Sequence, residues 1–504
     1  MRNKGRIIAL LVVAAVLVAV WIFLGKQAST ESTDTTPEPE DTINEITMVP
    51  FSQSDIVKIE METPEGVLVM NQISSTVEQR TQAEDGTIQT ASVEVNIWES
   101  KDMDIDTDNA KSVAFGGGFL KTKRKIVDNA NSEDLKNFGF DNVWKVTFTT
   151  KDNQTATVIV GGETPDKNNF YVMTPGNPAI YTAGKYSVEP LKMDRLKLTN
   201  KNVYRRTDTL PTDITAITFN RDGKLLFKAV TNQDGFWDMI EPLAVQADGT
   251  SFNAMQIAFA GVTATEHILV NDTDLATYGL ENPKYEFIYT LAGKEHTLQI
   301  GSKAPNSGYL YCKLDNIETV FTQDPQLFTF LDKPFVELID KFVYIPAIYD
   351  VTEMTAAIDG RVDKMVFDVP KPDNTKEEDP PETFILNGVK LEGKDSISGI
   401  KRYYQGAIGV RADRVDFEAK PVYEPEKSVL TIEYTMRKGE DTYMKVELIP
   451  TEDGYGYYAM RNGVYSYLIV SKTQIDEESM GIRNSYKEMN EKIAADNAKA
   501  TDSK

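Results

Sequence analysis

The chain has 504 residues, 41% of them hydrophobic, which is enough for about three globular domains with cores of their own. Its 54 basic and 77 acidic side chains give a net charge of −23, which disfavours binding to nucleic acid or to anionic lipid headgroups. The single cysteine, Cys312, excludes a disulfide framework and a thiolate metal cluster.

The chain begins with an unbroken apolar run of 18 residues, 7–24. As a helix this run would span about 27 Å, close to the hydrocarbon thickness of a bilayer. Arg2, Lys4 and Arg6 precede it, so the positive-inside rule places the N-terminus in the cytoplasm and the bulk of the chain in an extracellular or periplasmic space. We therefore predict that residues 1–26 form a cytoplasmic tip and a transmembrane anchor. A cleaved signal peptide is the alternative, for which the run is long and the following sequence is a poor cleavage site.

A polar linker and three similar domains are predicted after this segment. The linker covers residues 27–54 and contains three prolines, so it is expected to be extended. Repeat domain 1 is predicted at 55–206, repeat domain 2 at 207–349 and repeat domain 3 at 350–474. The remaining residues, 475–504, are charged and are expected to form a helical or disordered tail.

The domains are aligned by landmarks that recur at nearly constant spacing. In each, an aromatic residue in a strand-like run is followed 73 or 74 residues later by a tyrosine near a tight-turn signal. An aspartate lies 10 or 11 residues after the aromatic and precedes residues at helical spacing, so it is predicted to cap a helix. A period of about 140 residues fits a complete domain. The landmarks are Trp98, Asp108 and Tyr171, then Trp237, Asp248 and Tyr311, and then Phe384, Asp395 and Tyr458.

The predicted fold class is α+β, with an antiparallel sheet and a covering helix in each domain. Strand-like runs alternate polar and apolar residues before and after a helix-like segment. In that segment of domain 2 the apolar side consists of Phe252, Met255, Ile257 and Phe259. The two landmark tryptophans are expected to lie in the core beneath their helices.

Two further features vary among the domains. Gly139 and Gly279 each lie 22 residues before another glycine, at Gly161 and Gly301, and the shared glycines are predicted to form positive-φ turns. Domain 3 lacks this signature and has KPVYEPEK (420–427) instead, so its loop there is expected to differ. Domain 3 also carries the acidic, proline-rich insertion 371–382, which is expected to be a disordered loop tip.

Domain 2 resembles a known family. Its segments DLATYGLENP (274–283) and LQIGSKAPNSGYLYCKLDNIETVF (298–321) are similar to the bacterial domain-of-unknown-function family numbered 4340. The similarity is best over 235–345, weaker over 55–205 and weakest over 350–475. The resemblance implies an extracytoplasmic domain that stands beside a permease, as an auxiliary component of ABC-type export or gliding-motility-like systems. The family pattern supplies no catalytic residue and no cofactor.

We therefore expect a non-enzymatic, membrane-anchored auxiliary subunit of an ABC-type export complex that acts by protein–protein contact. The expected partner is a permease or another export-complex protein, with no nucleic acid, no cofactor and no identified small-molecule substrate. The alternative is a cell-surface binding module for cell-wall glycan or another extracellular ligand, with sugar-stacking rings from two tyrosine clusters. These clusters are Tyr403 and Tyr404, and Tyr455, Tyr457 and Tyr458. An extracellular hydrolase is a third hypothesis, but no pair of carboxylates is marked by its context.

Two sequence patterns resemble ligand-binding loops but depart from their consensus. Asp102, Asp104, Asp106 and Asp108 alternate as in a calcium loop, yet Phe115 stands where a bidentate glutamate is required. A solvated acidic turn with a helix cap at Asp108 is therefore preferred, and no metal site is predicted. The glycines at 116–118 lack the spacing of a phosphate loop, and two histidines do not suffice for a zinc site built on three.

Two further sets of residues are candidate contact surfaces. Lys121, Lys123, Arg124 and Lys125 form a basic cluster that is a possible docking patch, the alternative being a charged edge strand. Ala15 and Ala19 form a small-xxx-small pair that is a possible helix-packing face in the membrane, the alternative being a plain anchor.

Overall fold

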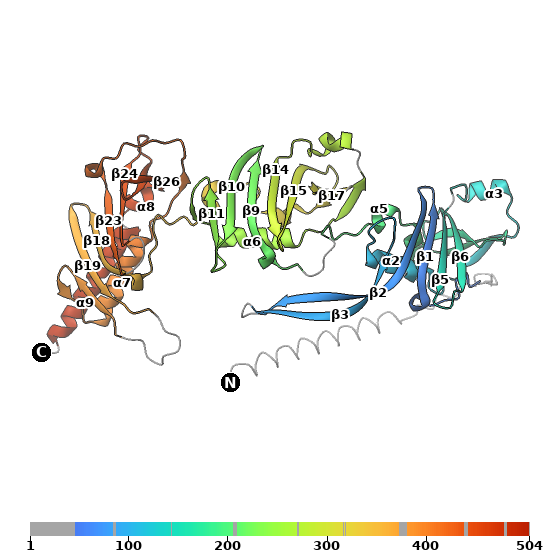
Figure 1. The fold of residues 1–504 in the computed structure, drawn as a ribbon, viewed down its shortest axis with the longest axis horizontal. Coiled ribbons are helices and arrows are strands. Elements are labelled where there is room, and N and C mark those ends of the chain that lie inside the picture. The colour runs from blue at the N-terminus through green and yellow to red at the C-terminus, as the bar shows by residue number, and fades with distance from the viewer. Residues whose placement is uncertain are drawn as a thin grey trace, which may run out of the picture.

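The structure is a computed structural model that describes residues 46–83, 87–142, 144–204, 209–269, 272–315, 317, 319–371, 381–437, 442–477 and 481–502. Three antiparallel sheets lie in a row along the chain (Figure 1). The predicted α+β class with three tandem sheet domains is therefore confirmed. The predicted anchor, with Ala15 and Ala19, lies outside the described residues. Within the described ranges, no helix is both long enough and apolar enough to cross a membrane.

Domain 1 consists of η1 (Gln53–Asp55), β1 (Ile56–Thr63), β2 (Gly66–Gln82), β3 (Ile88–Glu99), α2 (Thr107–Gly117), β4 (Arg124–Val127), α3 (Ser132–Asn137), β5 (Lys145–Thr150), β6 (Thr155–Glu163), β7 (Asn169–Met173), β8 (Ile180–Gly184), α4 (Lys185–Val188), η2 (Glu189–Lys192) and α5 (Arg195–Leu198). Its sheet has the order β3-β2-β1-β5-β6-β7-β8-β4.

Domain 2 consists of η3 (Pro211–Asp213), β9 (Ile214–Arg221), β10 (Lys224–Thr231), β11 (Trp237–Glu241), β12 (Val245–Gln246), α6 (Gly249–Ala260), β13 (Glu266–Leu269), η4 (Asp272–Tyr278), β14 (Tyr285–Leu291), β15 (Lys294–Lys303), β16 (Leu310–Leu314), β17 (Thr319–Gln323), η5 (Pro325–Phe328) and η6 (Phe335–Glu337). Its sheet has the order β12-β11-β10-β9-β14-β15-β16-β17-β13.

Domain 3 consists of η7 (Ile348–Asp350), β18 (Val351–Ile358), β19 (Arg361–Asp368), β20 (Thr383–Leu386), β21 (Val389–Lys390), α7 (Lys394–Ile408), β22 (Arg414–Val415), η8 (Pro425–Lys427), β23 (Leu430–Met436), β24 (Tyr443–Pro450), β25 (Gly456–Arg461), β26 (Val464–Ser471), α8 (Lys472–Asp476) and α9 (Gly481–Asp502). Its sheet order, β21-β20-β19-β18-β23-β24-β25-β26-β22, repeats the connectivity of the first two domains.

One helix packs on the sheet of each domain and buries an aromatic landmark. Trp98 and Trp237 are 3% and 5% exposed, and the ring of Trp237 lies 5.0 Å from that of Phe252 on α6. Phe252, Met255 and Phe259 are buried, but Ile257 is 51% exposed and does not belong to the apolar side predicted for it. The reason is the helical period, which turns Ile257 away from the stripe formed by the other three.

Two of the three predicted helix caps are wrong. Asp248 accepts a hydrogen bond from the backbone N–H of Ser251 and caps α6 as expected. In domain 1 the cap is Asp106, which accepts from the N–H groups of Asp108 and Asn109, so Asp108 lies inside the first turn of α2. In domain 3 the cap position is Gly393, and Asp395 also lies inside the helix. The aspartate landmark therefore marks the first turn, where a negative charge is favourable, more reliably than the cap itself.

The shared glycines serve two different purposes. Gly139 and Gly279 have φ values of 77° and 69°. Gly161 and Gly301 do not adopt positive φ; a Cβ on them would lie 2.6 Å from Phe138 O and 2.2 Å from Tyr278 O. The second glycine of each pair is thus required by close backbone approach and not by a turn.

The two connectors between domains make the same backbone hydrogen bonds. In the first, Leu198 O accepts from Asp106 N (2.8 Å) in domain 1, and Lys201 O accepts from Ala264 N (2.7 Å) in domain 2. In the second, the equivalent carbonyls of residues 338 and 341 accept from residues 248 (2.9 Å) and 412 (2.6 Å). Each connector thus pairs with the loop before the helix of its own domain and with the loop after the helix of the next.

The hydrophobic core of domain 1 is separate from the cores of domains 2 and 3, which are connected. The buried hydrophobic residues of domain 1 form one connected cluster, and those of domains 2 and 3 together form another. Val336, Leu338, Ile339 and Val343, in and just before the second connector, belong to this shared cluster. Domains 2 and 3 therefore share apolar packing across their junction, whereas domain 1 has a core of its own.

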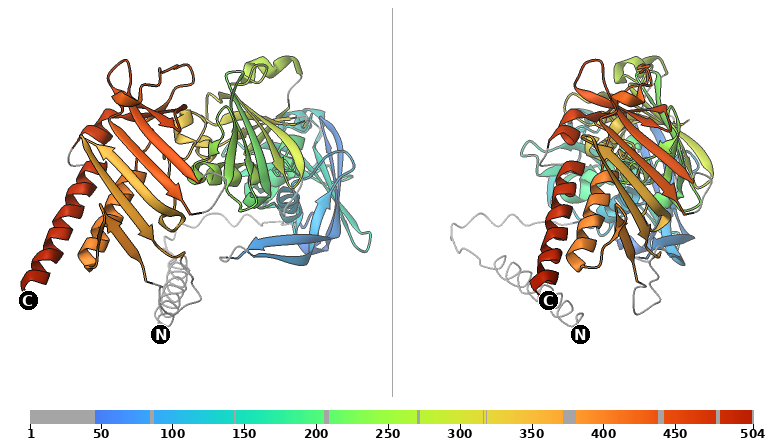
Figure 2. Two further views of the ribbon diagram at one scale, coloured as in Figure 1. Left: turned by 60° about the vertical axis from the view of Figure 1, so that its left-hand side comes forward. Right: turned by 90° about the vertical axis from the view of Figure 1, so that its left-hand side faces the viewer.

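The C-terminal segment belongs to domain 3. Helix α9 runs along α7 (Figure 2) and buries Ile482 and Met489 in the core. Asp496 of α9 accepts hydrogen bonds from the N–H (2.7 Å) and Oγ (2.9 Å) of Ser396. It supplies the cap that Gly393 cannot provide, and a Cβ at Gly393 would lie 1.9 Å from the Asp496 carboxylate.

Replacement of Trp237 by alanine is expected to destabilise domain 2 by about 3–5 kcal/mol, because a large buried ring is removed. Trp237→Phe should cost less than about 2 kcal/mol, since the indole Nε1 has no hydrogen-bond partner to lose. The measurement is hydrogen exchange of β9–β11 in the full chain. Phe236→Ala is the matched control, because this neighbouring ring is 58% exposed. Equal protection in the Trp237→Ala and Phe236→Ala variants would refute the core assignment.

The hydrogen bonds from Ser396 lower the pKa of Asp496 below its ordinary value of 3.8. A lowered folded-state pKa stabilises the fold above the ordinary pKa, and this contribution is lost as the pH falls through the lowered value. The melting temperature of the wild type should therefore fall at acidic pH, and Asp496→Asn should lack this fall. Glu491→Gln, on an exposed position of α9, should leave the acid profile of the wild type unchanged. Identical acid profiles for wild type and Asp496→Asn would contradict the capping role.

Candidate functional site

A two-stranded arm is the main elaboration of domain 1. Strands β2 and β3 pair from Asn71↔Glu99 to Gln82↔Ile88, whereas the pairing of β1 with β2 ends at Asn71. The outer part of the ribbon therefore projects beyond the sheet, beside domain 2 (Figures 1 and 2). Domain 2 has five residues, 232–236, between the equivalent strands. The arm is thus an insertion into one copy of a repeated hairpin.

The arm is amphipathic and its edges are open. One face carries Ile73, Val77, Val93, Val95 and Ile97, all half-buried. The opposite face is mostly polar: Ser74, Thr76 and Glu78 are exposed, whereas Arg80 is half-buried. Neither outer edge of the arm pairs with another strand in the described part of the chain. Open edges and a half-buried apolar face are the properties by which a strand pairs with another protein.

An ion pair joins the arm to domain 2. Arg80 Nη1 and Nη2 donate to the two carboxylate oxygens of Asp213 at 2.8 and 3.1 Å. The side chains are 20% and 13% exposed. Asp213 Oδ2 also accepts from the backbone N–H of Leu210 at the start of domain 2. A bidentate pair fixes direction as well as distance, so it orients the arm relative to domain 2.

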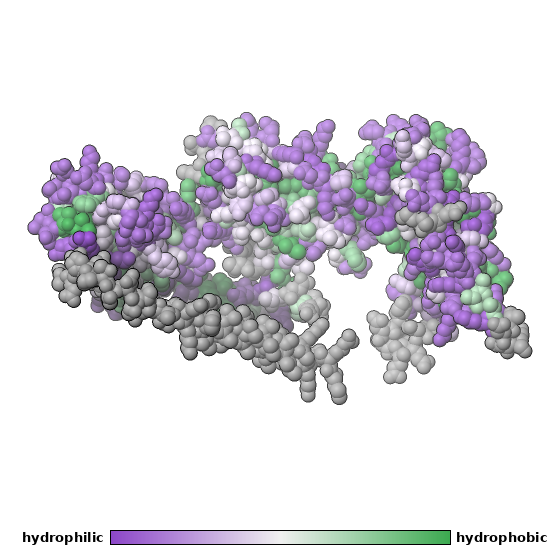
Figure 3. Space-filling model, turned by 180° about the vertical axis from the view of Figure 1, so that it is seen from behind, coloured by the Kyte–Doolittle hydropathy of each residue, from purple (hydrophilic) through white to green (hydrophobic). Residues whose placement is uncertain are grey.

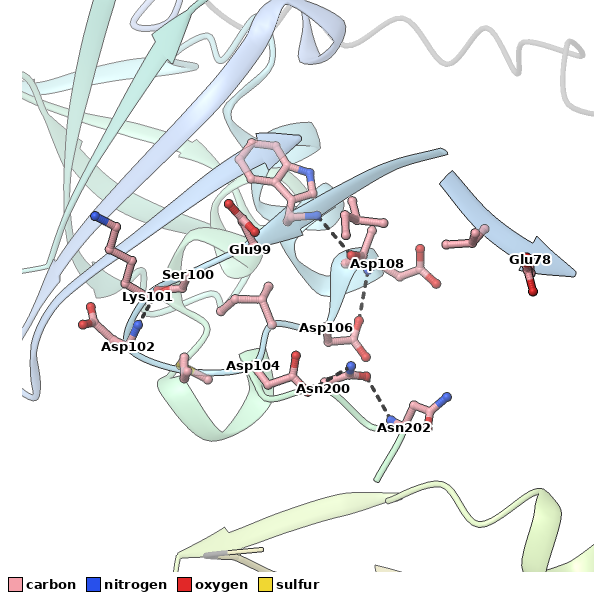
Figure 4. Close-up of a pocket in the computed structure, with 16 residues that line it drawn as sticks. Glu78, Glu99, Ser100, Lys101, Asp102, Asp104, Asp106, Asp108, Asn200 and Asn202 are labelled. Carbon is pink, nitrogen blue, oxygen red and sulfur yellow. Dashed lines mark hydrogen bonds between the residues drawn. The ribbon is translucent and has the colours of Figure 1, made fainter. Parts of the chain in front are cut away.

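An acidic hollow of about 1060 Å³ lies between the base of the arm, the loop before α2 and the first connector (Figure 4). Val77 and Ile97 of the apolar arm face line it, and so do Asn200 and Asn202 of the connector. It also contains six carboxylates and one lysine: Glu78, Glu99, Asp102, Asp104, Asp106, Asp108 and Lys101. The hollow therefore presents negative charge next to apolar side chains.

The alternating aspartates do not converge on one point. Asp106 caps α2, Asp104 accepts from the Asn200 side chain (3.3 Å), and Asp108 pairs with Lys111 (3.2 Å). In Figure 4 Asp102 lies at the far side of the hollow from Asp108. No group of three His, Cys, Asp or Glu side chains in the described ranges is arranged to hold a metal ion.

The predicted basic patch lies along an edge of the sheet of domain 1. Arg124 and Lys125 belong to the edge strand β4, and Lys121 and Lys123 directly precede it. All four residues are exposed, and Lys125 Nζ lies 3.0 Å from Asp128 Oδ1. The position matches the charged edge strand that was the alternative interpretation, and such charges discourage unwanted strand pairing.

Both histidines have local structural partners. His267 interacts with Thr319 Oγ1 (2.9 Å) and with Asn200 O (2.8 Å) of the connector, and burial lowers its pKa. His296 Nδ1 lies 2.5 Å from Asp315 Oδ2. Each is therefore part of the packing of domain 2 and not of a shared site.

The tyrosines considered as a sugar platform are mostly internal. Tyr403, Tyr404 and Tyr457 are 0%, 3% and 4% exposed, whereas Tyr455 is 80% exposed. Tyr403 packs on Tyr486 of α9. The predicted clusters therefore do not form a row of exposed rings. The surface in Figure 3 is largely hydrophilic, with hydrophobic residues in small patches.

Sequence reasoning missed the arm and the connectors. The arm had a signal in the alternating runs at 72–82 and 88–99, separated by AEDGT. The connectors had one in the paired heptapeptides LTNKNVY (198–204) and LIDKFVY (338–344). Both segments are short, and neither contains a catalytic or ligand-binding motif that would single it out in the sequence.

Replacement of Arg80 by alanine should release the arm from domain 2. A bidentate, partly buried pair contributes about 1 kcal/mol, so the loss is local. Hydrogen exchange of 72–99 in the full chain should accelerate while the sheet of domain 2 stays protected. Lys58→Ala is the matched control, because it removes the Lys58–Glu60 pair on the main sheet. Unchanged exchange in the arm of Arg80→Ala would show that other contacts hold it.

Comparison with known proteins identifies a family and no characterised relative. No curated protein and no solved structure matches the chain. The family model described as domain of unknown function (DUF4340) matches residues 99–237 and 237–392. Each match begins near a landmark tryptophan and crosses a connector into the following domain. Since the two segments cover more than half of the chain, this protein belongs to the DUF4340 family.

Proposed function

We propose that this protein is a membrane-anchored, extracytoplasmic auxiliary subunit of an ABC-type export complex that acts by protein–protein contact. The arm of domain 1 is the proposed contact element. Three features of the arm together support this proposal: it has open edges, it has a half-buried apolar face, and an ion pair holds it against domain 2.

Physical reasoning supports the arm as a contact element. Backbone donors and acceptors on an open edge gain partners when another strand adds to it, and alternate side chains then select the partner. A long open edge with an apolar face also promotes aggregation when it has no partner. Retention of such a ribbon on a protein with a net charge of −23 is therefore consistent with a specific partner.

The export-complex assignment has a different basis. It rests on what the DUF4340 resemblance implies and on the apolar, basic-flanked segment at 7–24. An anchor of this kind would keep the three domains at the membrane surface beside a permease. Acidic domains of this kind fit a protein partner better than nucleic acid.

The proposal predicts partner-specific crosslinking on one face of the arm. A photo-crosslinking residue at Val95 should capture an integral membrane protein in intact cells, whereas one at Thr76 on the polar face should not. Val95→Lys should reduce mild-detergent co-purification of the partner by about tenfold or more, because a charge would be buried at the contact. Thr76→Lys is the matched control, and mass spectrometry identifies the captured protein.

Three results would contradict the proposal. The tagged chain recovered alone from native membranes would argue against a stable complex. Equal capture from positions 76 and 95 would argue against the arm as the contact. Retention by purified cell wall, with no membrane partner, would instead support a surface binding module.

A further inference from the structure

A second hollow lies at the junction of domains 2 and 3. It has a volume of about 170 Å³. Leu243, Ala244 and Val245 line it from domain 2, and Arg461 and the residues 464–468 line it from the β25–β26 hairpin. An engineered cavity of about 150 Å³ holds a benzene-sized molecule, so there is room here for a small organic ligand.

Arg461 is a half-buried cation that lines this hollow. Its Nε atom has no hydrogen-bond partner, and no carboxylate in the described part of the chain forms an ion pair with it. Burial lowers the pKa of this guanidinium, and Asp340 acts on it only through space. A buried N–H group without an acceptor is unfavourable, and an anion in the hollow would gain a charge-assisted hydrogen bond from it.

The repeat shows that this position does not need a charge. Arg461 is the third residue after the landmark Tyr458, and the equivalent residue after Tyr311 in domain 2 is Leu314. Leu314 is 1% exposed and belongs to the core. A leucine therefore satisfies the fold at this point of the sheet, and the arginine in domain 3 has a different role.

The β25–β26 hairpin forms the wall of the hollow opposite residues 243–245, and its backbone is irregular there. The register of β25 and β26 shifts between Tyr458 and Met460. Tyr467, which lines the hollow, has a φ of 63°. Such a backbone angle is strained for a bulky residue, and bulges of this kind redirect side chains beside binding sites.

We propose that this hollow binds a small aliphatic carboxylate between domains 2 and 3. The carboxylate would pair with the guanidinium of Arg461, and the hydrocarbon part would lie against Leu243 and Val245. Because both domains contribute walls, the bound anion also bridges them.

The test uses the full chain and isovalerate as probe, with its neutral isostere isovaleramide as the ligand control. Isothermal titration calorimetry should detect isovalerate binding to the wild type and no binding of isovaleramide. Arg461→Leu, which installs the residue of domain 2, should bind isovalerate at least about tenfold more weakly. Arg414→Leu is the matched protein control, because it removes a nearby arginine paired with Asp453 outside the hollow, and it should bind normally.

Thermal melting provides a second readout with opposite expectations. Without the probe, Arg461→Leu should melt at a higher temperature than the wild type, because a buried Nε–H group without an acceptor is removed. With the probe, the wild type should gain stability and Arg461→Leu should not. Equal affinity of wild type and Arg461→Leu, equal binding of the amide, or no isovalerate binding to the wild type would overturn the proposal. The comparison of isovalerate with isovaleramide on the wild type decides the question even if a variant fails to fold.

Discussion

Backbone hydrogen bonds of the two connectors determine how the three sheets are arranged. The carbonyls of each connector accept hydrogen bonds from the loop before the helix of one domain and from the loop after the helix of the next domain. Such bonds are independent of side-chain identity, so the same junction forms twice with different flanking residues. The acidic hollow is lined by domain 1 and by the first connector, and the second hollow lies between domains 2 and 3, which the second connector joins. The connectors therefore help to position both hollows.

The three domains share one fold but differ in their cores and in the elements added to them. Domain 1 has a separate core and carries the arm, whereas domains 2 and 3 share one connected core. Helix α9 packs along α7 in domain 3.

Local errors in the sequence prediction have identifiable physical causes. The assignment of Asp108 as a cap was wrong because Asp106 and Asp108 have the same chemistry, and the connector carbonyl at Leu198 selects the backbone position where α2 begins. The assignment of Asp395 was wrong because Asp496, distant in sequence, performs the capping. Tyr403 and Tyr404 were offered as surface rings, yet α7 places them in the core. In each case a long-range contact decided between local alternatives of similar energy.

The sequence by itself determined the repeated α+β domain, because hydrophobic alternation, helical spacing and paired glycines are local signals and occur in each copy at the same interval. It also determined family membership, since those signals lie in the segments that match the DUF4340 model. Tertiary structure alone decided that the arm lies beside domain 2, that α9 completes domain 3 and that Arg461 faces a hollow. These features depend on contacts between residues far apart in the chain, such as Arg80 with Asp213, and no local pattern encodes such a pairing.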